Sequence, residues 1–226
     1  MRLLFLHGAG GFIDDGPLAA ALGDAVGLTP DMPRLPDDDM SFEAWATPIR
    51  EHLSHLDADD LVIAHSFGAS ILLRVLAEGS AQFPRAHQRA RVALLAMPDW
   101  SDAGWDVSDY AFHGPEPEMI LSLHHCRDDE VVPFAHLWLH ASRLPAARVW
   151  EYRSGGHQFT GLANRIAADA GSRSGVARAR VFDGPPAFVG GQAIRGPSRR
   201  TIRPTSARTR CVTPCQDLSP GPTLAG

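Results

Sequence analysis

Three short segments of the chain contain the residue types that nucleophilic catalysis requires. Ser66 lies in "AHSFGAS", Asp128 and Asp129 lie in "HHCRDDEVVPF", and His157 lies in "SGGHQF". A serine hydroxyl is a good nucleophile at neutral pH only when a base removes its proton and an acid orients that base. In enzymes whose nucleophilic serine lies on a turn between a strand and a helix, the three catalytic residues follow the chain order serine, aspartate, histidine. These residues predict a Ser-His-Asp triad, with Asp128 and Asp129 both open as its acid.

The sequence around Ser66 predicts such a turn. An apolar run, Leu61 to Ala64, precedes the serine, and a helical stretch, Phe67 to Glu78, follows it. Small residues at Ala64 and Gly68 leave room for a strained turn that lifts the hydroxyl clear of the backbone. The helix start would also place developing negative charge near the positive end of the helix dipole. The alternative interpretation is a serine that only caps the helix.

A glycine-rich segment follows the first apolar run, in "LLFLHGAGGF" from Leu3 to Phe12. Glycine has no Cβ, so backbone N–H groups can turn toward an approaching atom without steric cost. Beside a nucleophilic serine, that atom is a carbonyl oxygen that becomes negative, and the N–H of Phe67 would be a second donor to it. A phosphate or dinucleotide loop is the competing interpretation. The G-x-G-x-x-G spacing fails at Ile13, however, and the chain contains no GK[ST] motif.

Short apolar runs alternate with longer amphipathic stretches before residue 171. The predicted strands are Arg2 to Leu6, Ala25 to Leu28, Leu61 to Ala64, Arg91 to Ala96, Met119 to His124 and Arg148 to Tyr152. The predicted helices are Pro17 to Leu22, Phe42 to Leu56, Phe67 to Glu78, Ala135 to Ser142 and Gln158 to Ala168. Thr47 and Pro48 predict that the second helix starts late or kinks there. The alternation predicts a mainly parallel sheet in a three-layer α/β/α sandwich.

The segments that could do chemistry all follow predicted strands. The glycine-rich segment follows the first strand, Ser66 the third, Asp128 and Asp129 the fifth, and His157 the last. In parallel sheets, ligands bind at the carboxyl ends of the strands. We therefore expect all of these residues at one edge of the sheet.

Several histidines and acidic residues raise the question of a metal site. The candidates are His124, His125, Cys126, Asp128 and Asp129, together with His136 and His140, which share a helical face. The metalloprotease pattern requires a glutamate after its first histidine, and Leu137 stands there instead. In a strand, His124 and His125 would point to opposite faces. We therefore expect no metal, and we expect residues 37–39, three aspartates, to form a solvated loop.

Length and composition favour one catalytic domain, which we place at residues 1–170. The chain has 226 residues, a formal net charge of -5 and only three cysteines, which argues against a disulfide framework. The first apolar run is far shorter than a secretory h-region or the roughly 20 residues of a membrane span. We therefore expect a cytoplasmic protein with no membrane partner.

The segment 171–226 differs in composition from the rest of the chain. It is rich in arginine, glycine and proline, and its only acidic residues are Asp183 and Asp217. Such a basic segment can bind nucleic acid, but this one lacks aromatic interleaving and shows no helical or strand period. We predict a tail that is disordered or a non-native end, and no nucleic-acid partner.

Four sequence blocks resemble those of a known superfamily. "LHGAGG", "AHSFG", "RDDEVVP" and "GGHQF" resemble the corresponding blocks of small, cap-poor serine esterases among the α/β-hydrolases. The resemblance covers Met1 to Ala170. It implies a trimmed α/β-hydrolase fold, without the two strands that fuller members carry ahead of the "HG" strand, similar to the retinoblastoma-binding-protein-like branch. It also implies Asp129 as the acid, four residues before the proline of a "D-x-x-V-P" block, and Ala9 as the loop donor to the oxyanion, with Gly10 as the alternative.

An aromatic segment lies where hydrolases of this type place a cap. Trp100, Trp105, Tyr110 and Phe112 stand between the fourth and fifth predicted strands. The segment is too short for a helical lid. We therefore expect a minimal cap, a shallow aromatic wall for small or medium acyl or alcohol groups, with plain surface packing as the alternative.

These observations predict a serine hydrolase that cleaves small carboxylic esters through an acyl-enzyme intermediate. Ser66 would attack, His157 would move the proton, Asp129 would orient the imidazole, and the N–H groups of Ala9 and Phe67 would hold the oxyanion. A thioesterase, an amidase or peptidase, and an acyltransferase share this machinery and remain alternatives, as does a non-catalytic binding protein on the same fold. We expect an ester or thioester as the small-molecule partner, no cofactor, and a monomer or homodimer.

Overall fold

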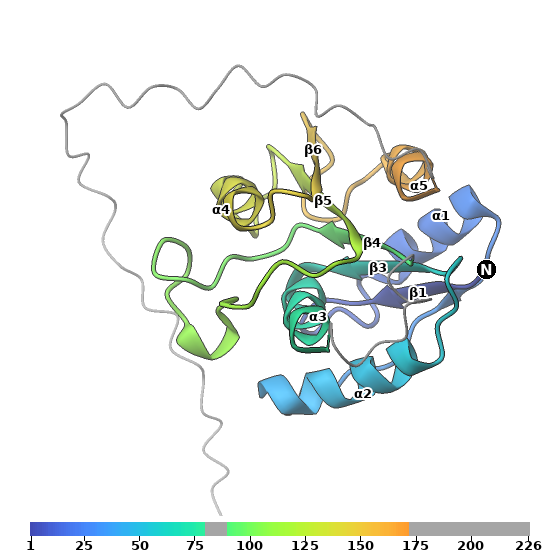
Figure 1. Ribbon diagram of the computed structural model, residues 1–226. Helices are drawn as coiled ribbons and strands as arrows, with labels where there is room; N and C mark the ends of the chain where they lie inside the picture. The colour runs from blue at the N-terminus through green and yellow to red at the C-terminus, as the bar shows by residue number, and fades with distance from the viewer. Residues whose placement is uncertain (80–89, 172–226) are drawn as a thin grey trace, which may run out of the picture. The chain divides into compact units, whose positions relative to one another are not determined.

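Six strands form one sheet in the computed structural model, which describes residues 1–79 and 90–171 (Figure 1). The strand order is β2-β1-β3-β4-β5-β6, and every neighbouring pair is parallel. The strands are β1 (Leu3–Leu6), β2 (Pro30–Asp31), β3 (Leu61–His65), β4 (Arg91–Leu95), β5 (Ile120–Cys126) and β6 (Arg148–Tyr152). The chain divides into the units Met1–Phe182 and Asp183–Gly226, and all described residues belong to the first.

Helices cover both faces of this sheet. One face is covered by α1 (Gly16–Val26) and α5 (Ala163–Gly171) (Figure 1). The other is covered by α2 (Phe42–Ser54), α3 (Ser66–Gly79) and α4 (Ala135–Arg143). A single 3-10 turn, η2 (Ser108–Tyr110), lies in the connection from β4 to β5. The predicted three-layer α/β/α sandwich with a mainly parallel sheet is therefore confirmed.

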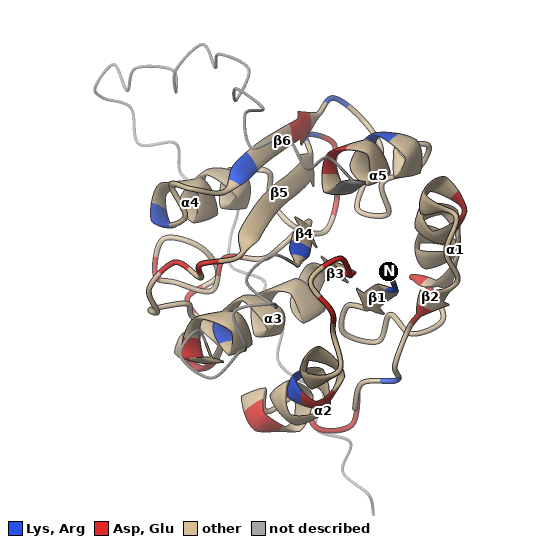
Figure 2. Ribbon diagram, turned by 45° about the vertical axis from the view of Figure 1, so that its right-hand side comes forward, with Lys and Arg blue, Asp and Glu red and all other residues tan. Residues whose placement is uncertain are grey.

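Side chains of each strand alternate between the two cores. Leu3 and Phe5 of β1 pack with α1 and α5, whereas Leu4 and Leu6 pack with α2 and α3. This alternation follows from the two-residue period of a strand, and a strand that is covered on both faces therefore carries mostly apolar residues. The strands β1, β3 and β5 accordingly carry no Asp, Glu or Arg (Figure 2).

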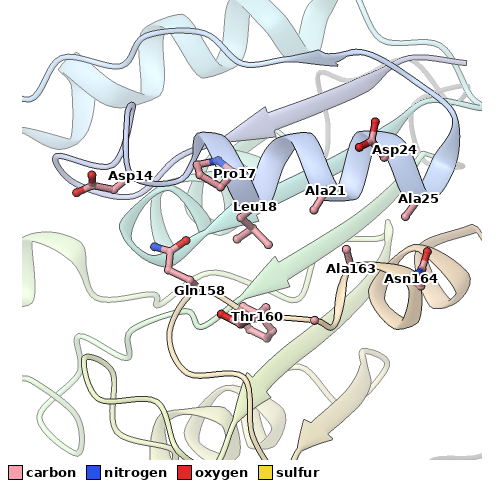
Figure 3. Close-up of a pocket in the computed structure, with 12 residues that line it drawn as sticks. Asp14, Pro17, Leu18, Ala21, Asp24, Ala25, Gln158, Thr160, Ala163 and Asn164 are labelled. Atoms are coloured by element: carbon pink, nitrogen blue, oxygen red, sulfur yellow. The ribbon is translucent and has the colours of Figure 1, made fainter.

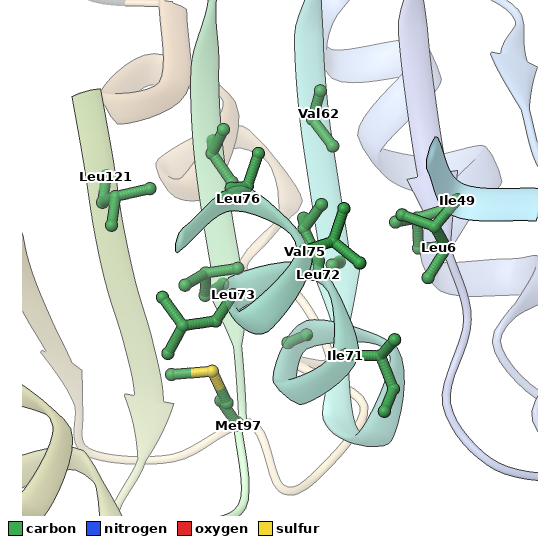
Figure 4. Close-up of a cluster of buried hydrophobic side chains, with 14 of the residues drawn as sticks. Leu6, Ile49, Val62, Ile71, Leu72, Leu73, Val75, Leu76, Met97 and Leu121 are labelled. Carbon is green, nitrogen blue, oxygen red and sulfur yellow. The ribbon is translucent and has the colours of Figure 1, made fainter. Parts of the chain in front are cut away.

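Helix α3 is the most deeply buried helix of the described residues and follows the candidate nucleophile. Its side chains Leu72, Leu73, Val75 and Leu76 are at most 1 % exposed and lie against β3, β4 and β5 (Figure 4). Each fully buried side chain of this kind contributes about 1.5 to 3 kcal/mol of transfer free energy. The packing fixes the direction in which α3 leaves the sheet, and with it the position of Ser66 at the first turn of the helix.

The predicted strand at Ala25 to Leu28 is wrong. Helix α1 continues to Val26 and ends at Gly27, which adopts the left-handed conformation (φ 72°) of a helix C-cap. The edge strand β2 is instead Pro30–Asp31, two residues paired with β1. An apolar run at the end of an amphipathic helix resembles a short strand in the sequence, because periodicity does not separate the two at this length.

The predicted start of one helix, α5, is also wrong, and α2 does not adopt the late start that Thr47 and Pro48 suggest. Helix α2 begins at Phe42, where the Ser41 hydroxyl accepts a hydrogen bond from a backbone N–H of the first turn, and Pro48 lies inside the helix. Proline removes one helical hydrogen bond, and the buried side chains around it outweigh that loss. Helix α5 begins at Ala163 rather than Gln158, because Phe159 (φ 51°) and Gly161 (φ 75°) are left-handed and hold this segment in turns.

The order in which strands are added to the sheet changes direction between β1 and β3. The chain runs from β1 outward to β2, returns to β3 on the other side of β1, and continues to β6. Loops that leave such neighbouring strands separate to opposite faces, which opens a crevice at the carboxyl ends. The glycine-rich segment and Ser66 lie at this point of the sheet.

No helix in residues 1–79 and 90–171 is long and apolar enough to cross a membrane. Nearly all of the predicted Arg-rich tail lies outside the described residues.

Gly68 packs the first turn of α3 against the end of β1. A Cβ at this position would lie 2.3 Å from the backbone oxygen of His7. We expect Gly68→Ala to lower the free energy of unfolding by about 1 to 3 kcal/mol, because the helix must move away from the strand. Urea denaturation measures this change. Gly16→Ala is the matched control, since a Cβ there meets no atom within 4 Å. Equal stability of Gly68→Ala and wild type would contradict the contact.

Candidate active site

Ser66 occupies a strained turn between β3 and α3. Its φ angle is 51°, one of the few positive values at a non-glycine residue in the described chain. Such a conformation costs of order 1 to 3 kcal/mol and places the side chain at the exposed corner between strand and helix. Gly8 approaches it closely, because a Cβ on Gly8 would lie 3.0 Å from Ser66 Cβ and 3.5 Å from Ser66 Oγ. The serine hydroxyl therefore lies directly beside the glycine-rich loop.

Three consecutive acidic residues after β5 hold the loop that carries His157. Asp128 accepts hydrogen bonds from the backbone N–H groups of the two glycines before the histidine, at 3.2 and 2.9 Å. Asp129 lies 3.1 and 3.0 Å from His157 Nδ1 through its two oxygens. Glu130 accepts a bond from the backbone N–H of His157 at 3.2 Å. Of the two candidate acids, Asp129 lies beside the imidazole, whereas Asp128 accepts hydrogen bonds from the backbone.

The carboxylate of Asp129 is surrounded by donors. Its Oδ1 accepts from the backbone N–H groups of Val131 and Val132 at 2.9 and 2.8 Å, and His125 Nε2 lies 3.3 Å from Oδ2. Burial alone would raise the pKa of Asp129, but the hydrogen bonds from His125, His157 and Val132 hold it well below its usual range. An ionised carboxylate only accepts hydrogen bonds, so His157 Nδ1 carries a proton. In the neutral form of such a ring, the lone pair is on Nε2.

The His157 loop lies against the residue that precedes the serine. His65 and His157 have ring centroids 4.5 Å apart, and His65 Nε2 lies 3.0 Å from the backbone oxygen of His157. The Ser66 hydroxyl itself makes no hydrogen bond with any described residue, His157 included. The structure therefore brings His157 and Asp129 together, places Ser66 at the adjoining strand end, and leaves the bond between serine and imidazole unformed.

The glycine-rich loop leaves one backbone N–H free beside Ser66. Gly8 O accepts from His7 Nδ1 at 2.7 Å and from the N–H of Gly11 at 2.9 Å. In a trans peptide the N–H of Ala9 points opposite to that oxygen, and no described residue accepts it. The N–H of Gly10, the alternative donor, instead bonds Asp37 at 2.7 Å. Ala9 is therefore the available donor of the two.

A second free donor comes from α3. The first N–H groups of a helix have no partner within the helix, and Phe67 is the second residue of α3. Its N–H follows the candidate nucleophile directly, as the sequence predicts for an oxyanion donor. The arrangement offers two backbone donors from different strand ends, which is what stabilises a developing negative charge on a carbonyl oxygen.

Aromatic side chains continue from Phe67 along one side of this region. Phe67 contacts Trp100 and Tyr110 edge to face, with centroids 5.8 and 4.9 Å apart, and Trp100 contacts Trp105 at 4.9 Å. The Tyr110 hydroxyl donates to the backbone oxygen of Met40 at 2.9 Å. The segment between β4 and β5 thus packs an aromatic cluster against the buried ring of Phe67, the residue after the serine.

The histidines considered as metal ligands have other partners. His136 Nδ1 accepts from the N–H of Asp99 at 2.8 Å, and His140 Nε2 donates to a backbone oxygen at 3.1 Å. Burial lowers the pKa of His140 to about 4. His124 bonds the Tyr152 hydroxyl, whereas His125 bonds a backbone oxygen elsewhere. Within residues 1–79 and 90–171 no three His, Cys, Asp or Glu side chains are arranged to hold a metal ion.

A cavity of about 660 Å³ lies away from this chemistry, between α1 and the turns before α5 (Figure 3). Pro17, Leu18, Ala21 and Ala163 line its apolar part, with Asp14 and Gln158 at one end. Neither Ser66, Asp129 nor His157 lines it. The cavity is therefore not the space in front of the candidate nucleophile.

Four residues of the site were not predicted from the sequence. Asp15, His7, His65 and Glu130 each make buried or loop-fixing hydrogen bonds at this edge. Histidines directly after β1 and at the end of β3 were visible as parts of motifs, but nothing local indicated their partners. Asp15 stood at a helix start, where an aspartate is ordinarily a cap.

Solved structures show which fold this is. The ydeN gene product from B. subtilis superposes with a TM-score of 0.56 and 17 % identity over 75 % of this chain and 97 % of that one. Mouse alpha/beta hydrolase domain-containing protein 10 gives 0.54 and 11 % over 74 % and 87 %, and the meta-cleavage product hydrolase CumD from Pseudomonas fluorescens gives 0.52 and 14 % over 75 % and 90 %. Comparisons with family models and with curated protein sequences find no match. The chain has the α/β-hydrolase fold, as its sequence blocks predict.

The lowered pKa of Asp129 predicts how stability depends on pH. A carboxyl group with a lower pKa in the folded state stabilises the protein above its unfolded pKa of about 4, and this contribution is lost as pH falls through the folded pKa. We expect Asp129→Asn to be less stable than wild type at pH 7, and the two curves to converge toward pH 2 at up to about 1.4 kcal/mol per pH unit. Urea denaturation across this range measures it. Parallel curves would contradict the assignment.

Proposed function

We propose that the protein is a serine hydrolase that cleaves small carboxylic esters through an acyl-enzyme intermediate. The observation that carries this proposal is the hydrogen bond between Asp129 and His157 Nδ1, formed next to a serine in a strained strand-to-helix turn. Structural neighbours that are named as hydrolases support a hydrolase. The steps below use side chains and backbone groups of this chain, the ester and one water molecule.

The first half of the reaction forms the acyl-enzyme. His157 Nε2 takes the hydroxyl proton as Ser66 Oγ attacks the ester carbonyl carbon, and Asp129 stabilises the imidazolium that results. The N–H groups of Ala9 and Phe67 donate to the carbonyl oxygen as it becomes negative. Removal of one such donor typically costs about 3 to 4 kcal/mol of barrier. When the tetrahedral intermediate collapses, the imidazolium gives its proton to the departing alkoxide and the alcohol leaves.

The second half releases the acid. Water takes the place of the alcohol, His157 removes a proton from it, and the hydroxide attacks the acyl carbon bound to Ser66. The same two backbone groups hold the second oxyanion. Collapse returns the proton to Ser66 Oγ, so the enzyme ends in its starting state with Asp129 ionised throughout. We infer that Trp100 and Tyr110, which pack against Phe67, contact small acyl or alcohol groups of the substrate.

Covalent labelling tests the nucleophile. We expect a fluorophosphonate probe to modify wild-type protein at Ser66 and to leave Ser66→Ala unlabelled, because only an activated serine attacks the phosphorus centre. Mass spectrometry of the labelled peptide gives the site. Ser142→Ala, which removes an exposed hydroxyl of α4 that bonds the backbone oxygen of Leu139, is the matched control and should label as wild type does. Labelling that persists in Ser66→Ala, or wild type that does not label, would refute the proposal.

Substitution of the two adjacent aspartates, Asp128 and Asp129, should lower kcat to different extents. On p-nitrophenyl esters of increasing chain length, we expect Asp129→Asn to lower kcat by about 10⁴-fold, because an amide no longer holds the required tautomer. Asp128→Asn should cost no more than about 10-fold, since its carboxylate bonds only backbone N–H groups. Matched thioester and anilide substrates report the preferred leaving group. Equal losses in the two variants would contradict the assigned acid.

A further inference from the structure

A second buried carboxylate, Asp15, lies beneath the candidate site. Its side chain is only 3 % exposed. Oδ2 accepts from the backbone N–H of Gly8 at 2.8 Å and lies 2.9 Å from His65 Nδ1. Oδ1 accepts from the side-chain amide of Gln158 at 2.8 Å. One carboxylate thus joins the glycine-rich loop, the residue before the serine and the residue after the candidate base.

The Asp15 side chain does not cap helix α1, which begins at the next residue. Asp15 occupies the N-cap position of α1, where an aspartate ordinarily accepts a hydrogen bond from the first turn, but its side chain makes no such bond. Gly11 is packed against the carboxylate, since a Cβ there would lie 2.7 Å from Asp15 Oδ2. The side chain is therefore committed to the strand ends and not to the helix.

The partner of Asp15 is a histidine between two acceptors. His65 is 1 % exposed, with Nδ1 facing the Asp15 carboxylate and Nε2 lying 3.0 Å from the backbone oxygen of His157. Neither a carboxylate nor a carbonyl oxygen can donate, so the ring needs a hydrogen on both nitrogens. Burial raises the pKa of Asp15, but the hydrogen bond and charge of His65 and the bond from Gly8 lower it to about 2. Asp15 is therefore the ionised acceptor of this pair.

We infer that Asp15 and His65 form a buried ion pair that positions the glycine-rich loop and the backbone of His157 relative to each other, and so sets the geometry between the oxyanion donors and the general base. The inference rests on the proposed function, which assigns the roles of oxyanion donor and general base. Asp15 and His65 touch neither substrate nor reacting atoms, so they are positioning residues. A misplacement of about 1 Å at such a distance can cost about 100-fold in rate.

The protonation of His65 is tested by 15N NMR of histidine-labelled protein. At pH 7.5 we expect one imidazole with both nitrogens protonated, which is assigned to His65 by its loss in His65→Gln. In Asp15→Asn this signal should change to that of a neutral ring, because the counter-ion is gone. A neutral His65 in wild-type protein overturns the inference, whatever the activity.

Kinetics test the positioning role. We expect Asp15→Asn to lower kcat on p-nitrophenyl esters by about 10- to 100-fold with KM within about 2-fold of wild type. Asp14→Asn, the same substitution at the exposed neighbouring residue, is the matched control and should keep wild-type kcat. The double variant Asp15→Asn/His65→Gln should be no worse than the poorer single variant, since the residues act as a unit. Circular dichroism checks that each variant is folded.

The outcomes separate the two proposals. Loss of activity in Ser66→Ala together with equal kcat for Asp15→Asn and wild type would overturn the positioning role and leave the serine hydrolase standing. Activity that persists in Ser66→Ala would refute the hydrolase mechanism, while the NMR result would still decide the ion pair. Additive losses in the double variant would also contradict a pair that acts as one unit.

Discussion

The close approach of the β1 loop to the turn at the end of β3 is the constraint on which the candidate site depends. The two strands pair in parallel with Leu6 opposite Ala64, so both loops leave the sheet at the same level. Contact is possible because glycines stand at the points of approach: Gly68 lies against the backbone of His7, and Gly8 lies against Ser66. A side chain at either place would separate the strained serine from the free N–H of the loop. Sheet register and two missing Cβ atoms thus bring the candidate nucleophile and the proposed oxyanion donor together.

Buried carboxylates hold the remaining loops to this pair of strands. Burying a charge is costly unless it is paired and hydrogen-bonded, and both Asp15 and Asp129 meet donors on each oxygen. Asp129 fixes the loop after β6 to the loop after β5, and Asp15 fixes it to the loop after β1. The His157 loop is therefore anchored from two sides. Removal of either carboxylate would leave buried donors unpaired, which is a larger loss than the net value of the bonds themselves.

Much of the arrangement was predictable because it follows from local pattern. Parallel strands that are covered on both faces appear in the sequence as apolar runs. Glycine, serine or aspartate directly after such a run marks the carboxyl end of the strand. This pattern predicts that Ser66, Asp129 and His157 lie at one edge of the sheet. Asp15 and His65 were not predictable in this way, since they are 50 positions apart and each has a plausible local interpretation as a helix cap and a strand residue. The strand prediction for Ala25 to Leu28 was wrong for a related reason, because a short apolar run with a glycine does not distinguish a helix C-cap at Gly27 from a strand. Pairings across the sheet need the fold before they can be seen.

The two acid–imidazole pairs show how the same residue types acquire different roles. In both pairs a buried carboxylate faces the Nδ1 of a histidine, at 3.0 Å for His157 and 2.9 Å for His65. The difference lies at the second nitrogen. His65 Nε2 meets a carbonyl oxygen, which requires a proton there and leaves no lone pair for chemistry. His157 Nε2 meets no hydrogen-bond partner among the described residues, so its lone pair remains available to a hydroxyl. The group that faces Nε2, and not the carboxylate that faces Nδ1, therefore distinguishes the proposed base from the proposed ion pair. For His65 that group is the backbone carbonyl of His157, the proposed base itself.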